Sequence, residues 1–237
     1  MATTYKTFSA NDIVSTRTLL HEAIPLTGTI VSGTYKSGST PTNVKNYSHG
    51  MFQSVYDYPY LSSSANHIFD LSVGISANSD LSSSMGANSQ HAKKQNTYNQ
   101  MAQVLMGFDE NGAIRLFDED GDLASVGTKL KEVIFVNFSR LLTKDEIKKG
   151  TFKIELDVET AFTTSLNPMA THRIKVYDKD AENNYFVNSP AGDYGILYAD
   201  TTTSNGDTLT NDDPSLTTQA KAGLLFYQAG IAVLSGS

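Results

Sequence analysis

A run of apolar residues near the end of the sequence, at 224–234, limits the folds open to this chain more than any other feature. It reads LLFYQAGIAVL and carries no charged residue. A strand with one face in water alternates apolar and polar side chains, whereas a strand covered on both faces does not. We therefore predict a strand at 224–234 that is covered on each side, with a β-bulge at Gly230. Such a strand needs neighbours, from this chain or from another subunit.

Other segments also have the alternation or the composition of strands. Residues 151–158 alternate apolar and charged side chains, which is typical of a strand with one face in water. Strands are also predicted at 68–75, 133–138, 171–177 and 193–198. Ser, Thr and Asn make up about a quarter of the chain, and they disfavour helix interiors. The expected fold class is therefore mainly β with minor α, its antiparallel sheets arranged as in a β-sandwich or barrel.

Three helices are predicted beside these strands. The longest spans 92–106, where apolar side chains fall near one face of a helix. A short helix near 13–22 follows capping residues and is stopped by Pro25. Another short helix near 143–149 has a Thr cap, acids in its first turn, lysines in its last and a terminal Gly150.

A short pattern occurs twice, as FDENG at 108–112 and as FDEDG at 117–121. Asn-Gly and Asp-Gly favour tight turns, because Gly accepts a positive φ and the Asx side chain bonds the backbone two residues on. We predict two successive turns, one on each side of a short strand.

The second of these turns also suggests a calcium site. Asp118, Asp120 and Asp122 have the one-three-five spacing of a calcium loop. Such a loop also needs Gly at its sixth position and Glu at its twelfth, where this chain has Leu123 and Lys129. A solvated turn is the preferred interpretation, and a calcium site at the three aspartates is the alternative.

Several classes of catalytic and cofactor site lack their sequence signals. The chain has no Cys, which excludes thiol nucleophiles, iron–sulfur clusters and Cys-ligated zinc. It has no G-x-S-x-G, no phosphate-binding glycine loop and no G-x-G-x-x-G. Its five His are far apart in the sequence, so only a three-His site or a dispersed triad assembled by the tertiary structure stays open. We expect no enzyme, no catalytic residues and no cofactor.

Charge and hydropathy exclude two kinds of partner. The net charge is −7 and the basic residues are scattered, which argues against nucleic acid. The N-terminus has no basic start followed by an apolar stretch, and the chain nowhere contains a run of about 18 apolar residues. We therefore expect a soluble protein without a signal peptide or a membrane span.

Four long phrases of the sequence resemble a known family. They are YSHGMFQSVYDYPY at 47–60, SSSANHIFD at 62–70, FSRLLTKDEIKKG at 138–150 and SPAGDYGILY at 189–198. Together they resemble virion structural proteins of T4-like tailed phages (myoviruses) that infect marine cyanobacteria. The resemblance spans most of the chain. It implies a particle component for which the family supplies no catalytic residues.

The resemblance implies a non-enzymatic role in a virion, with tail, baseplate or neck as the favoured place and capsid decoration as the alternative. Assembly in the reducing cytoplasm of the bacterial host suits a chain without Cys. The expected partners are other virion proteins and copies of this chain in a symmetric homo-oligomer. Aromatic and apolar side chains of 47–60 and 224–234 are the interface candidates. They are Phe52, Tyr56, Tyr58, Tyr60, Leu224, Phe226, Tyr227, Ile231 and Val233.

One β-rich domain is expected over 1–237, with a minor subdivision near 80–92 as an alternative. The resemblance leaves open that the chain is the N-terminal part of a longer protein. A rival function of a different class is a carbohydrate-binding or host-receptor recognition module. It would use the Tyr, His and Asp side chains of 47–76 to hold a sugar.

Overall fold

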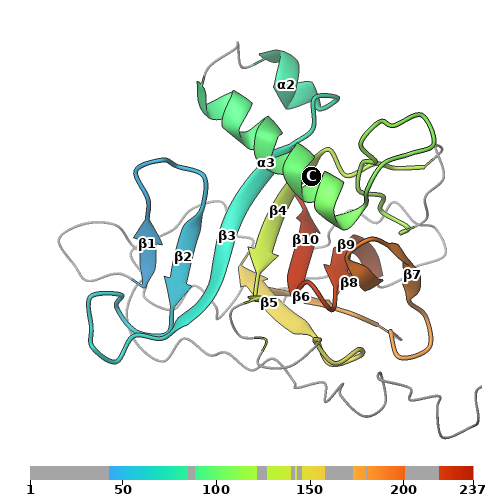
Figure 1. Cartoon of the computed structure of the whole chain (residues 1–237). Coiled ribbons are helices and arrows are strands. Elements are labelled where there is room, and N and C mark those ends of the chain that lie inside the picture. The colour runs from blue at the N-terminus through green and yellow to red at the C-terminus, as the bar shows by residue number, and fades with distance from the viewer. Residues whose placement is uncertain are drawn as a thin grey trace, which may run out of the picture.

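The computed structural model describes residues 43–84, 89–121, 127–139, 142, 146–157, 173–179, 181–200 and 219–236. These residues form one antiparallel sheet with two helices beside it (Figure 1). The strands are β1 Val44–Asn46, β2 Gln53–Tyr56, β3 His67–Ile75, β4 Glu132–Asn137, β5 Lys153–Asp157, β6 Arg173–Tyr177, β7 Phe186–Ser189, β8 Gly192–Asp200, β9 Gln219–Phe226 and β10 Ile231–Ser235. The helices are α2 Asp80–Ser84 and α3 Ser89–Leu105. The prediction of a mainly β antiparallel fold is confirmed, and the sheet is not closed into a barrel.

The order of strands places the end of the sequence in the middle of the sheet. It runs β1-β2-β3-β4-β10-β9-β8-β6-β5, and β7 pairs with β8 outside this path. β10 therefore lies between β4 and β9, with Ala232 opposite both Val136 and Leu225. Each edge of β10 is hydrogen-bonded within the chain, so it needs no strand from another subunit.

The apolar run 224–234 is two strands and not the single bulged strand that was predicted. β9 ends at Phe226, a turn follows, and β10 begins at Ile231, which is paired with Phe226. Gly230 lies in this turn with a φ of 65°, and its N–H donates to the Phe226 carbonyl at 2.9 Å. Folding the run back on itself lets both halves bury their side chains in the centre of one sheet.

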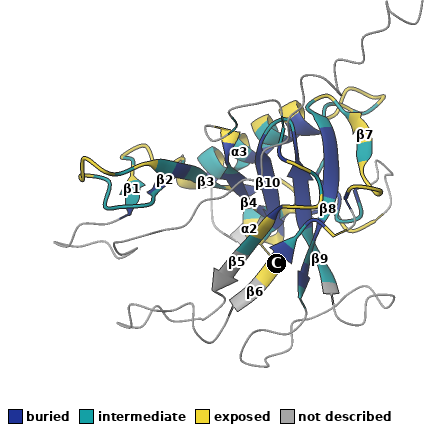
Figure 2. Cartoon of the chain, turned by 90° about the horizontal axis from the view of Figure 1, so that it is seen from below, coloured by how far each residue is buried: buried dark blue, intermediate teal, exposed yellow. Residues whose placement is uncertain are grey.

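Both faces of the central strands are covered, as the apolar run predicted. Leu224 and Phe226 point to the face that carries α3, and Leu225 and Tyr227 point to the other. The α3-side core consists of Tyr98, Ala102, Leu105, Met106, Phe117, Leu130, Val133, Phe135, Tyr194, Leu224, Phe226, Ile231 and Val233. The opposite core consists of Val136, Phe138, Ile147, Phe152, Val176, Ala181, Leu197, Ala199, Leu225, Tyr227, Ala232 and Leu234. Figure 2 shows this burial concentrated in β4, β8, β9 and β10.

Helix α3 confirms the predicted helix at 92–106 and begins three residues earlier. It packs on β3 at Gly74, where an added Cβ would lie 2.7 Å from the Phe135 ring and 3.1 Å from the Tyr98 Cα. The missing side chain at Gly74 therefore lets the helix approach the sheet closely. Of the described residues, no helix is long and apolar enough to span a membrane.

The helix predicted near 143–149 is absent over 146–149, and 143–145 lie outside the described residues. Ile147 is fully buried, and its N–H donates to the Tyr227 carbonyl at 3.0 Å. Lys149 and Gly150 form a turn. A helix of one or two turns is marginal by itself, so burial of one apolar side chain and pairing with the sheet outweigh good capping residues. The helix predicted near 13–22 lies outside the described residues.

Candidate functional site

The aromatic stretch forms an arm that extends from the body of the molecule. We define the arm as residues 43–67, which comprise β1, β2 and the loop that leads into β3. Figures 1 and 2 show β1 and β2 to one side of the strands that carry the core. Within the described residues β1 pairs only with β2, so β1 is an edge of the sheet. The predicted interface residues Phe52, Tyr56, Tyr58 and Tyr60 all lie on this arm, partly exposed.

A cluster of rings sits where the tip of the arm approaches α3. The Tyr47 and His49 rings are stacked at 5.4 Å between centroids, and the Phe52 ring lies 4.7 Å from Tyr47. Beside the cluster is a cleft of about 140 Å³, which α3 lines with Lys93, Lys94 and Thr97. Its other walls are the loop between β1 and β2 and the middle of β3. The cleft therefore combines aromatic rings with ammonium groups.

The contact between arm and helix is made by a hydrogen bond. Lys93 Nζ donates to the His49 carbonyl at 2.8 Å, which ties α3 to the turn at the tip of the arm. Lys45 Nζ lies 5.0 Å from the centroid of the Tyr47 ring, a cation–π distance. The sequence placed the aromatic residues, but it held no signal that lysines from α3 would stand beside them.

A second group, where the arm meets β3, contains Ser, His and Asp, the residue types of a hydrolase triad. Ser54 Oγ donates to Asp70 Oδ1 at 2.5 Å, and His67 Nε2 contacts the same oxygen at 2.7 Å. A nucleophilic triad needs the imidazole between the hydroxyl and the carboxylate. Here the carboxylate lies between the other two groups, so His67 is not placed to take a proton from Ser54. The arrangement instead holds β2 against β3, where Ser54 and Asp70 are paired.

Five of the predicted interface residues lie in the core, which corrects the prediction for them. Leu224, Phe226, Tyr227 and Val233 are fully buried, and Ile231 is 9% exposed. Their strands are paired on both edges within the chain. An apolar strand was predicted to need neighbours from this chain or from another subunit, and the strand order shows that this chain supplies them.

The second predicted turn, for which a calcium site was the alternative interpretation, contains an ion pair with a lysine. Gly121 N–H donates to the Asp118 carbonyl at 3.3 Å, which closes the predicted turn. The Asp118 carboxylate is buried and forms an ion pair with Lys129, the residue that stands where a calcium loop needs Glu. Burial lowers the pKa of Lys129. Among the described residues no three His, Cys, Asp or Glu side chains are grouped so that they could hold a metal ion, and Asp122 lies outside them.

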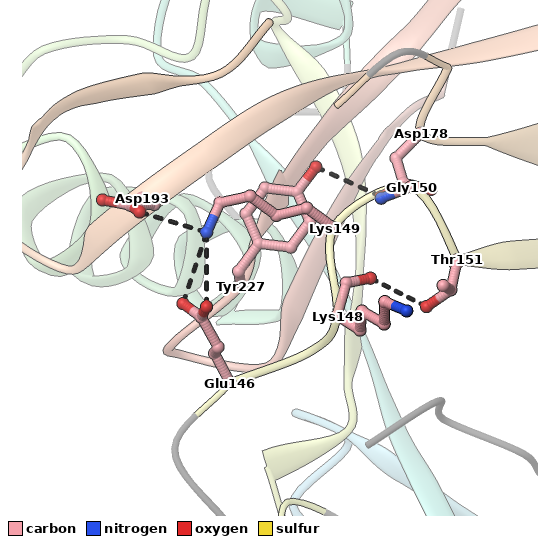
Figure 3. A network of polar contacts seen from close by, with 8 residues as sticks. All are labelled: Glu146, Lys148, Lys149, Gly150, Thr151, Asp178, Asp193 and Tyr227. Atoms are coloured by element: carbon pink, nitrogen blue, oxygen red, sulfur yellow. Dashed lines mark hydrogen bonds and ion pairs between the residues drawn. The ribbon is translucent and has the colours of Figure 1, made fainter. Parts of the chain in front are cut away.

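The structure assembles a further polar cluster that the sequence did not indicate (Figure 3). Lys149 Nζ lies 3.1 Å from Asp193 Oδ2 and 3.4 Å from each carboxylate oxygen of Glu146. The same nitrogen lies 5.0 Å from the centroid of the Tyr227 ring and 4.8 Å from that of Tyr185. Lys149 was predicted to lie in the last turn of a short helix. Its side chain is only 15% exposed, and that of Asp193 only 4%.

Tyr227 links this cluster to a second buried carboxylate. The Tyr227 hydroxyl donates to Asp178 Oδ2 at 3.2 Å, and the Gly150 N–H donates to the same oxygen at 2.7 Å. Burial raises the pKa of the Asp178 carboxyl, although both hydrogen bonds act to lower it. Burial, together with the charge on Asp178, also raises the pKa of Tyr227. The phenol therefore stays protonated and acts as a donor.

Comparison with known proteins returned no family model, no curated protein and no solved structure that matches this chain.

Proposed function

We propose that this chain is a non-enzymatic structural component of a tailed bacteriophage virion that acts through contacts between subunits. The resemblance of the four sequence phrases to cyanophage virion proteins supports this role. The observation that carries it in the structure is the arm, which presents partly exposed aromatic side chains and the edge strand β1 beside a core that needs no partner.

The arm has the chemistry of a protein interface. Tyr and Phe are enriched at interfaces because they bury large apolar areas with few rotatable bonds, and Tyr adds a polar group. Tyr56 and Tyr60 lie 6.3 Å apart between ring centroids, and Leu61 beside them is 80% exposed. In a symmetric assembly the same patch would meet its counterpart or a complementary surface on each neighbour. Tail, baseplate or neck is the favoured placement, and capsid decoration is the alternative.

Mass spectrometry of purified phage particles tests this proposal. We expect the chain to be present at a fixed copy number, in multiples of three or six on one axis for a tail, baseplate or neck protein. Particles assembled with the double variant Tyr58→Ala, Tyr60→Ala should contain fewer copies. Phe108→Ala, which changes an aromatic residue 47% exposed outside the arm, should leave the copy number unchanged. Absence of the chain from intact particles would refute the proposal.

The cleft beside the arm supports a second candidate, a carbohydrate-binding or host-receptor recognition module. Aromatic rings beside polar and ammonium groups are suited to a sugar ring and its hydroxyl or acidic substituents. On an array of host polysaccharides, the wild-type protein should then bind and the variants Tyr47→Ala and Phe52→Ala, which change rings that line the cleft, should not. Binding by the Phe108→Ala protein should equal wild type. Absence of wild-type binding to any host polysaccharide would refute this candidate.

A further inference from the structure

The cluster around Lys149 brings together an amine, a carboxyl group and a second carboxylate in a nearly closed site. Lys149 Nζ lies 3.1 Å from Asp193 Oδ2, so the amine nitrogen is in direct contact with the carboxyl group whose carbon it would attack. Glu146 lies against the same nitrogen, at 3.4 Å from both of its carboxylate oxygens. We propose that Lys149 and Asp193 join in an intramolecular isopeptide bond, with Glu146 as the group that carries the protons.

Burial supplies the conditions for this reaction. Amide formation starts from a neutral amine and a neutral acid, and moving one proton from the ammonium to the carboxylate removes two charges from a site that holds little water. A neutral amine is a nucleophile, whereas an ammonium group is not. The side chains of Lys149, Asp193 and Glu146 are 15%, 4% and 14% exposed. The rings of Tyr227 and Tyr185 border Lys149 Nζ and limit the water around it.

The atoms balance without any further reactant. The Lys149 Nζ lone pair attacks Asp193 Cγ, and a C–N bond forms. Glu146 accepts the proton that the nitrogen then loses and delivers it to the departing hydroxyl group, so that a C–O bond breaks and one water molecule leaves. The products are an amide and water, and Glu146 is again a carboxylate. Neither oxidation nor reduction takes place.

The backbone fixes the positions from which these side chains meet. The Tyr227 N–H donates to the Asp193 carbonyl at 3.0 Å, and the Ile147 N–H donates to the Tyr227 carbonyl at 3.0 Å. The turn after β9 therefore stands between the segment that carries Lys149 and the start of β8, which carries Asp193. Holding the two reacting groups in place replaces an encounter in solution by an intramolecular step. The bond would tie the segment before β5 covalently to β8.

The mass of the whole denatured chain tests the proposal, and it does not depend on the proposed role in a virion. Purified wild-type protein should be lighter than its calculated mass by one water molecule, and protease digestion should yield one branched peptide that contains Lys149 and Asp193. Lys149→Arg and Glu146→Gln should both keep the full calculated mass. Lys148→Arg changes the neighbouring, exposed lysine and should lose water as wild type does.

The same experiment distinguishes the isopeptide bond from another reaction that removes one water molecule. Asp120-Gly121 can close to a succinimide, which also removes one water molecule but does not join two peptides. A wild-type chain at its full calculated mass after prolonged incubation at neutral pH would overturn the proposal. So would water loss that persists in Lys149→Arg or that maps to Asp120. Wild-type measurements alone decide the outcome if either variant fails to fold.

Discussion

The arm and the body of this protein use the same residue types in opposite ways. In the body, the Tyr98 hydroxyl donates to the Leu130 carbonyl at 2.6 Å and that of Tyr194 donates to the Gly121 carbonyl at 2.8 Å, and both rings are fully buried. In the arm, Tyr56 and Tyr60 contact each other and stay partly exposed. Aromatic side chains are therefore buried in the core where other elements cover the sheet, and they stay partly exposed where no element covers it.

Carboxylates differ between the two regions in the same way. Burial raises the pKa of Asp178 in the body. In the arm, hydrogen bonds from Asn66 lower the pKa of Asp57, with the side-chain donor 2.9 Å from Oδ2 and the backbone N–H 2.6 Å from Oδ1. Desolvation controls the first group and hydrogen bonding controls the second. The comparison shows that the burial of a side chain, more than its residue type, decides how it affects the stability of the fold.

Replacing a core aromatic residue should have the largest effect. Phe226 is fully buried, 5.1 Å from Tyr194 and 6.3 Å from Phe117 between ring centroids. We expect Phe226→Asp to lower the free energy of unfolding by more than about 4 kcal/mol, because it leaves a cavity and buries a charge. Urea denaturation followed by circular dichroism measures this. Phe108→Asp, at an exposed position, is the control. A folded Phe226→Asp protein that had only changed its oligomeric state would contradict the assignment of β9 to the core.

Removing one tyrosine hydroxyl should lower the free energy of unfolding more in the body than in the arm. In Tyr98→Phe the Leu130 carbonyl loses its donor, and the Phe117 N–H loses the acceptor that lies 3.3 Å away. We expect a loss of about 1–3 kcal/mol in the free energy of unfolding, since both backbone groups are buried. Tyr56→Phe, on the arm, should change it by less than about 0.5 kcal/mol. Equal losses in the two variants would remove the distinction between arm and body.

The two carboxylates predict opposite dependences of stability on pH. Asp178 binds its proton more tightly in the folded protein than in the unfolded chain, so the stability it contributes is complete below the unfolded pKa of 3.8 and is lost as pH rises through the raised pKa. Asp57 contributes stability that is present above 3.8 and is lost as pH falls through its lowered pKa.

Denaturation of Asp178→Asn and Asp57→Asn across pH checks these signs. Relative to Asp178→Asn, the wild type should gain stability as pH falls from neutral. Relative to Asp57→Asn, it should lose stability at the acid end of the range. Carbon-13 NMR titration of the two carboxyl groups should place them on opposite sides of 3.8. Titration of both groups on the same side would contradict the comparison.

Truncating an arm tyrosine should have the smallest effect on stability. Tyr60 is partly exposed, and its described ring contact is with Tyr56 at 6.3 Å. We expect Tyr60→Ala to lower the free energy of unfolding by less than about 1 kcal/mol, the range for a surface aromatic pair. Thermal denaturation measures it, with Tyr194→Ala in the body as the contrasting variant. A large loss in Tyr60→Ala would mean that the arm belongs to the folding core.

Much of the secondary structure could be predicted from local patterns. The strands predicted at 68–75 and 193–198 correspond to β3 and β8, and the helix predicted at 92–106 corresponds to α3. Predictions from local patterns were wrong where a segment pairs with residues far away in the sequence. The capping residues at 143–149 favoured a helix, but Ile147 pairs with Tyr227, eighty positions along the chain, and is buried there.

The candidate site was predictable only in part, for the same reason. The arm aromatic residues are close in sequence and were recognised together, whereas Lys93 comes from α3 and meets His49 only after folding. The cluster of Glu146, Lys149 and Asp193 left no sequence signal, because its members are ordinary surface residue types until the fold removes water from them.

The sequence by itself determined a mainly β chain without thiol chemistry, and it determined that the run 224–234 has both faces covered. These properties follow from side-chain chemistry and from the two-residue period of a strand, which are local. Tertiary structure alone decided that this run turns at Gly230 and becomes the centre of the sheet. It alone decided that Lys149 faces two carboxylates and two tyrosine rings. Burial and long-range pairing depend on which segments meet, and local composition does not specify those encounters.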